Sequence, residues 1–226
     1  MRPSLQLVVS REPGLVVGPS GPAAPPLSEL GRATLVELFA NGRDGGAVGF
    51  ALRHAAPGKP ILWVQDRMAV QDTGRPFPPG LPAHDIVHVE ARDAKAALWA
   101  MEEGLRCPAL GLVIGEIWGE PRALDFTATR RLAVAAERAG VGATLILWQA
   151  APNLSGARMR WRVESRPSLP HPYDSRAPGA PVWNLDLFKA RGCAPGAWEA
   201  ADEAHGLRLL PPLGDGGLEA DGRTAA

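Results

Sequence analysis

The 226-residue sequence lacks the features of small secreted, metal-binding or membrane proteins. Its two cysteines, Cys107 and Cys193, form no CxxC pair, so neither a disulfide framework nor a zinc site is indicated. No stretch is apolar over the length needed to cross a bilayer, and the run Leu5–Val9 is too short for the core of a signal peptide. We therefore expect a soluble cytoplasmic protein without membrane contact or bound metal.

An excess of charge of one sign is also missing, because 24 Lys and Arg balance 24 Asp and Glu. A net charge of zero argues against general coating of nucleic acid. The distribution is uneven, since residues 157–191 hold seven cations and three acids, whereas residues 199–226 hold six acids and two arginines. A basic region followed by an acidic tail is typical of an interaction region, or of a tail that keeps the chain in solution.

The glycine-rich loop at 40–49 has no lysine, serine or threonine. Before it, Thr34–Phe39 is predicted to be a buried strand, and a helix is predicted over 45–56. This order aims backbone N–H groups at a phosphate. A working loop also needs a lysine for the terminal phosphates and a hydroxyl for Mg²⁺, and neither is present. The predicted degenerate nucleotide loop consists of Gly42, Gly45, Gly46 and Ala47, with Gly46 and Ala47 at the lysine and hydroxyl positions.

Other groups needed for phosphoryl transfer are missing as well. Glu116 lies near the place of the Mg²⁺-binding acid, but the usual position falls on Gly115, and Arg67 stands where a catalytic glutamate is expected. Positioning and charge stabilisation supply nearly all of this catalysis, so we expect no catalytic residue, no cofactor and no enzymatic activity. Weak nucleotide binding through backbone N–H groups stays open. A dinucleotide site built on glycines 42–49 and Asp66 is disfavoured, because the spacing is not G-x-G-x-x-G.

Strands and helices alternate through the first two thirds of the chain. Asp93 and Asp125 are predicted to cap two helices, and Gly140 to end the second one. This alternation predicts an α/β fold with a doubly wound, mainly parallel sheet. The predicted strands are 34–39, 60–65, 86–89, 110–114 and 144–148.

After Pro152 the hydrophobic pattern changes to period two. The runs 158–163 and 182–188 are predicted to form a C-terminal antiparallel strand pair on the edge of the sheet. The first run places three arginines on one strand face, which favours contact with DNA or an acidic partner; a solvated face is the other interpretation. These arginines are Arg158, Arg160 and Arg162.

The tryptophans fall into two groups. Trp99, Trp161 and Trp183 lie on apolar faces and are expected in the core. Trp118 and Trp148 follow strands at the carboxyl edge of the sheet, where ligands bind in open α/β folds. Their indoles would fill the place of a nucleotide or form a protein-docking surface. Trp198 is predicted to end the ordered part of the chain.

Several blocks resemble known proteins. Gly31–Phe39 resembles the opening of the RecA core, which is common to RecA-like folds. More specific blocks are similar to the ImuA family, the RecA-like proteins encoded beside error-prone polymerases. These blocks are Ala91–Cys107, Gly115–Trp118, Leu124–Leu132, Arg160–Val163 and Trp183–Trp198. The resemblance covers about residues 30–200.

The resemblance implies a RecA-like fold and a role in SOS-induced translesion DNA synthesis and mutagenesis. The implied partners are ImuB, an inactive Y-family polymerase, and RecA, with an error-prone polymerase III-type α subunit reached through ImuB. Contact with DNA is expected to be indirect, and the protein is expected at the nucleoid during DNA damage. Together with the missing catalytic groups, this indicates an interaction scaffold. The alternatives are a nucleotide-binding regulator and a SulA-type cell-division inhibitor.

The expected organisation has four parts: a flexible segment 1–29, a degenerate RecA-like core 30–150, a C-terminal strand module 151–200 and a disordered acidic tail 201–226. The strand module is the expected partner surface, because it carries the charge asymmetry. Its candidate contact residues are Arg158, Arg160, Arg162, Trp183, Arg191 and Trp198.

Overall fold

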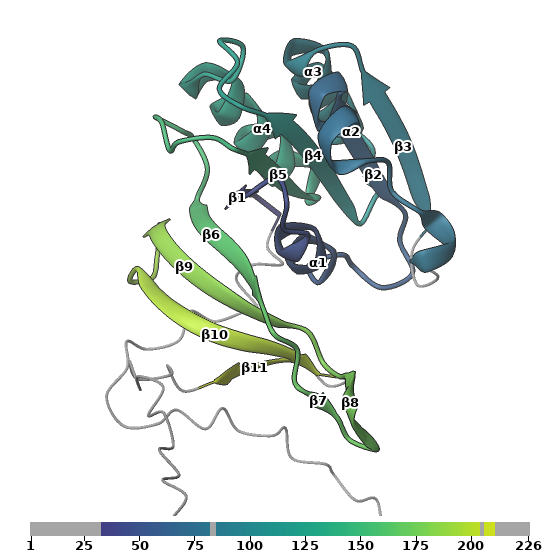
Figure 1. The fold of residues 1–226 in the computed structure, drawn as a ribbon. Coiled ribbons are helices and arrows are strands. Elements are labelled where there is room, and N and C mark those ends of the chain that lie inside the picture. The colour runs from purple at the N-terminus through teal and green to yellow at the C-terminus, as the bar shows by residue number, and fades with distance from the viewer. Residues whose placement is uncertain (1–32, 82–84, 204–205, 211–226) are drawn as a thin grey trace, which may run out of the picture.

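The computed structural model describes residues 33–81, 85–203 and 206–210 (Figure 1). A nine-stranded sheet has the order β11-β10-β9-β6-β1-β5-β4-β2-β3, and β7 and β8 form a separate hairpin. In chain order the strands are β1 (Leu35–Ala40), β2 (Ile61–Asp66), β3 (Ile86–Ala91), β4 (Leu112–Trp118), β5 (Gly142–Trp148), β6 (Met159–Arg166), β7 (Pro170–His171), β8 (Asp174–Pro178), β9 (Val182–Ala190), β10 (Gly196–Glu203) and β11 (Gly206–Leu210). The helices are α1 (Gly46–Leu52), α2 (Arg67–Thr73), α3 (Ala94–Gly104) and α4 (Phe126–Ala139), with a 3-10 turn at Pro78–Gly80.

The sheet confirms the predicted fold class, a doubly wound, mainly parallel, RecA-like α/β fold. Strands β1 to β6 pair in parallel, and the remaining pairs β6–β9, β9–β10 and β10–β11 are antiparallel. From β1 the chain passes over β5 and β4 to reach β2, and it later returns to fill both places. Such a reversal creates a crevice at the carboxyl ends of the strands, where open α/β folds bind ligands.

Two helical layers cover the parallel strands. Helices α3 and α4 pack on one face, and α1 and α2 on the other, so central strands are buried on both sides. The predicted helix caps are confirmed: the side chain of Asp93 accepts the N–H of Ala96, and that of Asp125 accepts the N–H of Ala128. Gly140 ends α4 in the left-handed conformation with φ +69°.

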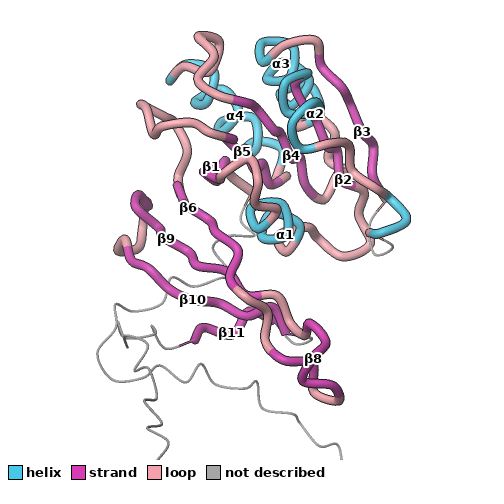
Figure 2. The backbone as a smooth tube through the Cα atoms, in the orientation of Figure 1, coloured by secondary structure: helices cyan, strands magenta, loops and turns pink. Residues whose placement is uncertain are grey.

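The C-terminal strands extend the sheet beyond the helices, and the β7–β8 hairpin projects from them (Figures 1 and 2). The predicted antiparallel pair is confirmed as β6 and β9. Its apolar face shares a core with α1, where Phe50 lies 5.8 Å from both Trp161 and Trp183, and Trp161 lies 6.0 Å from Trp198, between ring centroids. Removing these strands would therefore expose the core on which α1 packs.

Several boundaries differ from the prediction. The helix after the glycine-rich loop has seven residues and ends at Leu52, and α2 was not predicted at all. The predicted disorder of the acidic tail is wrong for residues 201–203 and 206–210, because β10 and β11 pair there. Trp198 lies inside β10 rather than at the end of the ordered chain. The predicted N-terminal segment 1–29 lies outside the described residues.

Candidate functional site

The loop after β1 contains a carboxylate, that of Asp44, which is hydrogen-bonded to the loop itself and to β6. Asp44 accepts hydrogen bonds from the backbone N–H of Gly46 at 2.8 Å, and from both the N–H, at 2.7 Å, and the hydroxyl of Ser165 on β6. Burial opposes the charge of Asp44, but these hydrogen bonds outweigh it and hold its pKa below the ordinary value. The ionised Asp44 thus takes an N–H group that a phosphate-binding loop offers to its ligand.

The glycines of this loop allow close protein packing. A Cβ atom on Gly42 would overlap the indole ring of Trp118. A Cβ atom on Gly46 would lie 2.7 Å from Oγ and 3.0 Å from the backbone N of Ser165, and Ala47 is fully buried. The N–H groups of Arg43 and Asp44 also bond within the chain, to Asn41, and those of Val48 and Gly49 bond to the carbonyl of Gly45. Contacts with Trp118 and with Ser165 of β6 therefore explain the glycines at 42 and 46.

Glu116, the predicted acid of the degenerate site, lies at the end of β4 with both carboxylate oxygens occupied. Its Oε1 accepts hydrogen bonds from the indole N–H of Trp63 and from the amide of Gln65 at 3.1 Å. Its Oε2 accepts hydrogen bonds from the indole N–H of Trp148 at 2.8 Å and from the hydroxyl of Thr73 at 3.3 Å. The side chain is about 1% exposed. A carboxylate held by four protein donors has no free oxygen to offer to a metal ion.

Burial raises the pKa of Glu116 above its ordinary value, although the four donors favour the charged form. The surrounding network continues outward, since Gln65 also lies 2.9 Å from the ring Nε2 of His88 and donates to the carbonyl of Gly74 at 2.9 Å. Polar groups that would otherwise face a ligand are thus paired with one another. Through this network Glu116 connects its own strand β4 to β2, β5 and α2.

The residues after β2 hold helix α2. Asp66 accepts the N–H of Ala69 at 2.7 Å as the N-cap of α2, and it accepts the N–H of Trp118 at 3.3 Å. Burial raises the pKa of Asp66. Arg67, which replaces the expected catalytic glutamate, is the first residue of α2 and is exposed. Asp66 therefore caps α2 and is hydrogen-bonded to β4. Both contacts argue against the interpretation of Asp66 as a ribose-binding acid.

A cavity of about 520 Å³ remains beside the loop, between α1 and the segment that follows α2. Trp63, Trp148 and Glu116 form its inner wall, and Arg43 and Phe77 lie nearer the surface. The predicted position of Trp148 at this edge is confirmed, and Trp118 packs on the loop itself. The cavity is large enough for a small molecule, but Asp44 takes the N–H of Gly46, and two indoles donate to Glu116.

The predicted partner residues do not form one exposed surface. Arg160 is about 3% exposed, and Trp183 and Trp198 are buried with α1, so these three contact predictions are wrong for the folded chain. Arg160 is buried because its guanidinium pairs with Glu37 of β1. The alternation of β6 does place Arg160 and Arg162 on one face, but the loop before β6 and the aromatic rings of β1 and β9 cover the first of them.

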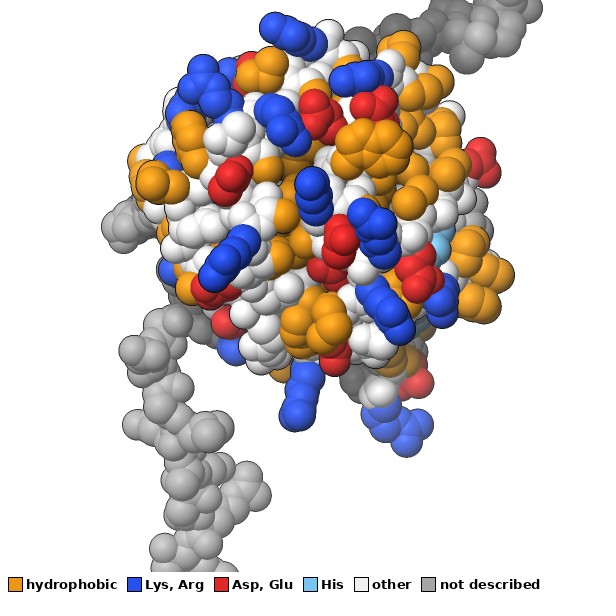
Figure 3. Space-filling model, turned by 90° about the horizontal axis from the view of Figure 1, so that it is seen from above, with side chains coloured by type: hydrophobic (Ala, Val, Ile, Leu, Met, Phe, Trp, Pro, Cys, Tyr) orange, Lys and Arg blue, Asp and Glu red, His pale blue; other side chains and the backbone are white. Residues whose placement is uncertain are grey.

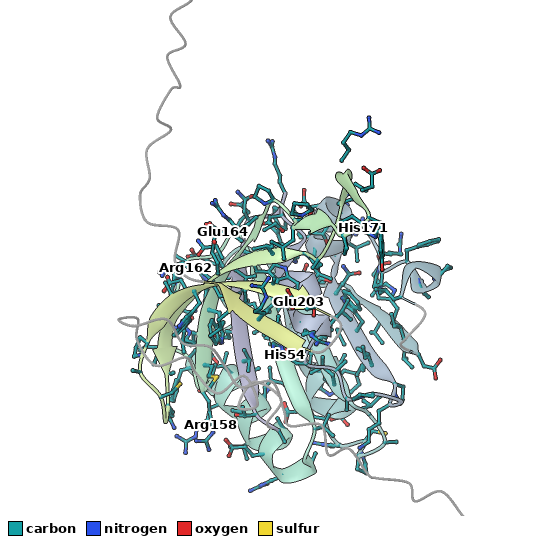
Figure 4. The ribbon with its side chains drawn as sticks, turned by 90° about the horizontal axis from the view of Figure 1, so that it is seen from below. His54, Arg158, Arg162, Glu164, His171 and Glu203 are labelled. Carbon is teal, nitrogen blue, oxygen red and sulfur yellow. The ribbon has the colours of Figure 1, made fainter. Side chains whose placement is uncertain are left out.

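Arg158, Arg162 and Arg191 are exposed. Arg158 pairs with Glu137 of α4 at 2.6 Å, and Arg162 pairs with Asp186 of β9 at 2.7 Å. In Figure 4, Arg162 lies beside Glu164, well apart from Arg158. Arg158 and Arg162 are thus neutralised by neighbouring acids. This arrangement favours the interpretation of a solvated strand face over that of a basic binding surface.

Three features of the site could not be read from the sequence. These are the bond from Ser165 to Asp44, the convergence of two indoles on Glu116, and the helix α2. The only local signal was Asp66, which has the residue type of a helix N-cap. Among the described residues, no helix is long and apolar enough to cross a membrane, and no group of three or more His, Cys, Asp or Glu side chains could hold a metal ion.

The geometry defines a RecA-like α/β protein in which Asp44 and Glu116, two acids of the predicted nucleotide site, are hydrogen-bonded within the chain. No family model matches the chain. The chain is 32% identical over 179 residues to Protein ImuA of Caulobacter vibrioides strain NA1000 / CB15N, covering 70% of this chain and 68% of that protein. The same values hold for Protein ImuA of strain ATCC 19089 / CIP 103742 / CB 15. The chain belongs to the ImuA family.

Proposed function

We propose that this protein is a non-catalytic RecA-like scaffold of the ImuA/ImuB mutagenesis system, acting in SOS-induced translesion DNA synthesis. Its direct partners are an ImuB-type inactive Y-family polymerase and RecA. ImuB links it to the error-prone polymerase III-type α subunit. It acts in the cytoplasm, at the nucleoid during DNA damage, and its contact with DNA is indirect.

The observation that carries the proposal is the hydrogen bonding of Glu116 and Asp44 within the chain. In an active phosphate-transfer site an acid binds Mg²⁺ and loop N–H groups bind phosphate. Here four protein donors hold Glu116, and Asp44 takes the N–H of Gly46. A fold that keeps its layout while its own side chains use these groups is best explained as a surface for other proteins.

The charge distribution supports indirect contact with DNA. Net charge is zero, and the view from above shows acidic and basic side chains interspersed, with no concentrated basic patch (Figure 3). Nucleic-acid binding depends mainly on cations that neutralise phosphates. Arg158, just before β6, and Arg162 and Arg166 of β6 each pair with a carboxylate instead.

The cavity beside the loop favours a second candidate, a nucleotide-binding regulator. Its volume of about 520 Å³ and its aromatic wall suit a small planar ligand. This candidate requires the protein to bind its partners differently with and without nucleotide, whereas the scaffold binds them equally.

The test is a binding titration of the purified protein against ImuB and RecA of the same organism, with and without MgATP. The scaffold predicts binding to at least one of them with a Kd that changes less than about twofold on adding MgATP. A tenfold change in Kd with nucleotide on this protein would favour the regulator. Absence of binding to both proteins would refute the proposed function.

A further inference from the structure

The outer face of helices α3 and α4 carries the most exposed tryptophan among those the structure describes. Trp99 is 63% exposed, although the apolar pattern of α3 predicted it in the core. The sheet-facing side of α3 is formed by other residues, namely Ala94, Ala97, Leu98 and Met101. The prediction is wrong because Trp99 falls outside this stripe, and most of its side chain lies in solvent.

Helical spacing places Trp99 along the line where α3 meets α4. Glu102 of α3 forms a salt bridge of 3.0 Å with Arg131 of α4, so this side of α3 faces its neighbour. Residues three and four apart share one side of a helix, and Lys95 and Trp99 therefore precede Glu102 on the same side. On α4, Val134 and Arg138 follow Arg131 at the same spacing. We call the strip formed by Lys95, Trp99, Glu102, Arg131, Val134 and Arg138 the helical seam.

The seam has unbalanced positive charge. Each acid of the two helices already pairs with an arginine: Glu102 with Arg131, Glu103 with Arg106, and Glu137 with Arg158. Lys95 and Arg138 form no salt bridge with the residues that the structure describes, and neither does Arg130 beside them. The seam thus runs from Lys95 and the exposed indole of Trp99, across the Glu102–Arg131 pair, to Val134 and Arg138. Its two cations without a salt-bridge partner among the described residues lie at its two ends.

We propose that the helical seam docks an acidic segment of a partner protein, which places an apolar side chain against Trp99. This inference rests on the proposed scaffold function. Exposed tryptophans surrounded by complementary charge are typical anchors of protein interfaces. A nucleic acid fits less well, because only Lys95 and Arg138 of the seam lack a salt-bridge partner among the described residues, whereas binding of a phosphate backbone depends on many cations.

The test compares three variants of the full chain in titrations against ImuB and RecA. Trp99→Ala is expected to weaken binding of the partner that docks here by about 10–100-fold, the range of an anchor residue. Lys95→Glu with Arg138→Glu should also weaken it and reduce its salt dependence. Tyr173→Ala is the matched control, because Tyr173 is a 94% exposed aromatic residue on the turn of the β7–β8 hairpin. It should bind as the wild type does.

Because Trp99 lies mostly in solvent, its truncation should leave the unfolding midpoint near that of the wild type, and Trp99→Phe should keep part of the affinity. Equal affinity of Trp99→Ala and the wild type for both proteins would refute docking at the helical seam, and it would not contradict the proposed scaffold function. Loss of single-stranded DNA binding instead of protein binding would also overturn it. No binding by the wild type to either protein would refute the scaffold, and the seam with it.

Discussion

Glu37→Ala is expected to lower the free energy of unfolding by about 3–5 kcal/mol, because it leaves a buried cation without its counter-charge. Glu37 and Arg160 are almost fully buried, and Nε of Arg160 lies 2.6 Å from Oε2 of Glu37. Ser155 donates to the other oxygen of Glu37, and Arg160 also donates to the carbonyl of Asn153 at 2.7 Å. The pair therefore joins β1, β6 and the loop between β5 and β6.

Urea unfolding followed by fluorescence measures this loss. Arg162→Ala is the matched control, because its pair with Asp186 is about half exposed and should contribute about 0–1 kcal/mol. Replacing both buried partners together, as Glu37→Leu with Arg160→Met, should recover much of the stability. A loss below about 1 kcal/mol for Glu37→Ala would contradict the structural role assigned to the pair.

Restoring the missing loop residues, as Gly46→Lys with Ala47→Thr, is expected to destabilise the protein without creating an ATPase. The lysine Cβ would meet backbone and side-chain atoms of Ser165, and the threonine would be forced into the core under α1. Overpacking of this kind costs about 1–3 kcal/mol at each position. No hydrolysis should follow, because Glu116 stays bound to its four donors.

The control for this pair is Gly45→Ala, since a Cβ atom on Gly45 would meet nothing within 4 Å. Its unfolding free energy should change by less than about 1 kcal/mol. A double variant as stable as the wild type would contradict the tight packing around residues 46 and 47, and one that hydrolyses MgATP would show that the loop is still an open phosphate site.

The sequence was sufficient for the architecture because the helices and parallel strands depend on local signals. Asp93 and Asp125 cap helices as their residue types indicate, and Gly140 adopts the conformation that only glycine adopts without cost. The apolar run in β4 indicated a strand covered on both faces, which the two helical layers provide.

The sites were harder to predict because they depend on long-range contacts. Alternation placed Arg160 on the same strand face as Arg162, but only the folded chain brings Glu37, 123 residues earlier, against it. The same holds for Asp44, whose partner Ser165 lies 121 residues further on. Trp99 was predicted in the core from its placement on an apolar face, whereas it lies outside the buried stripe of α3 and is exposed.

We propose that this RecA-like protein binds no nucleotide, because its own side chains occupy the hydrogen-bonding groups of Glu116 and the N–H of Gly46. The most direct test is the unfolding temperature of the wild-type protein in increasing MgATP, because a ligand that binds only the folded state must raise it. We predict no concentration-dependent rise up to millimolar MgATP. A rise that saturates with MgATP concentration would mean that the cavity beside Trp148 still binds nucleotide, and it would contradict the claim.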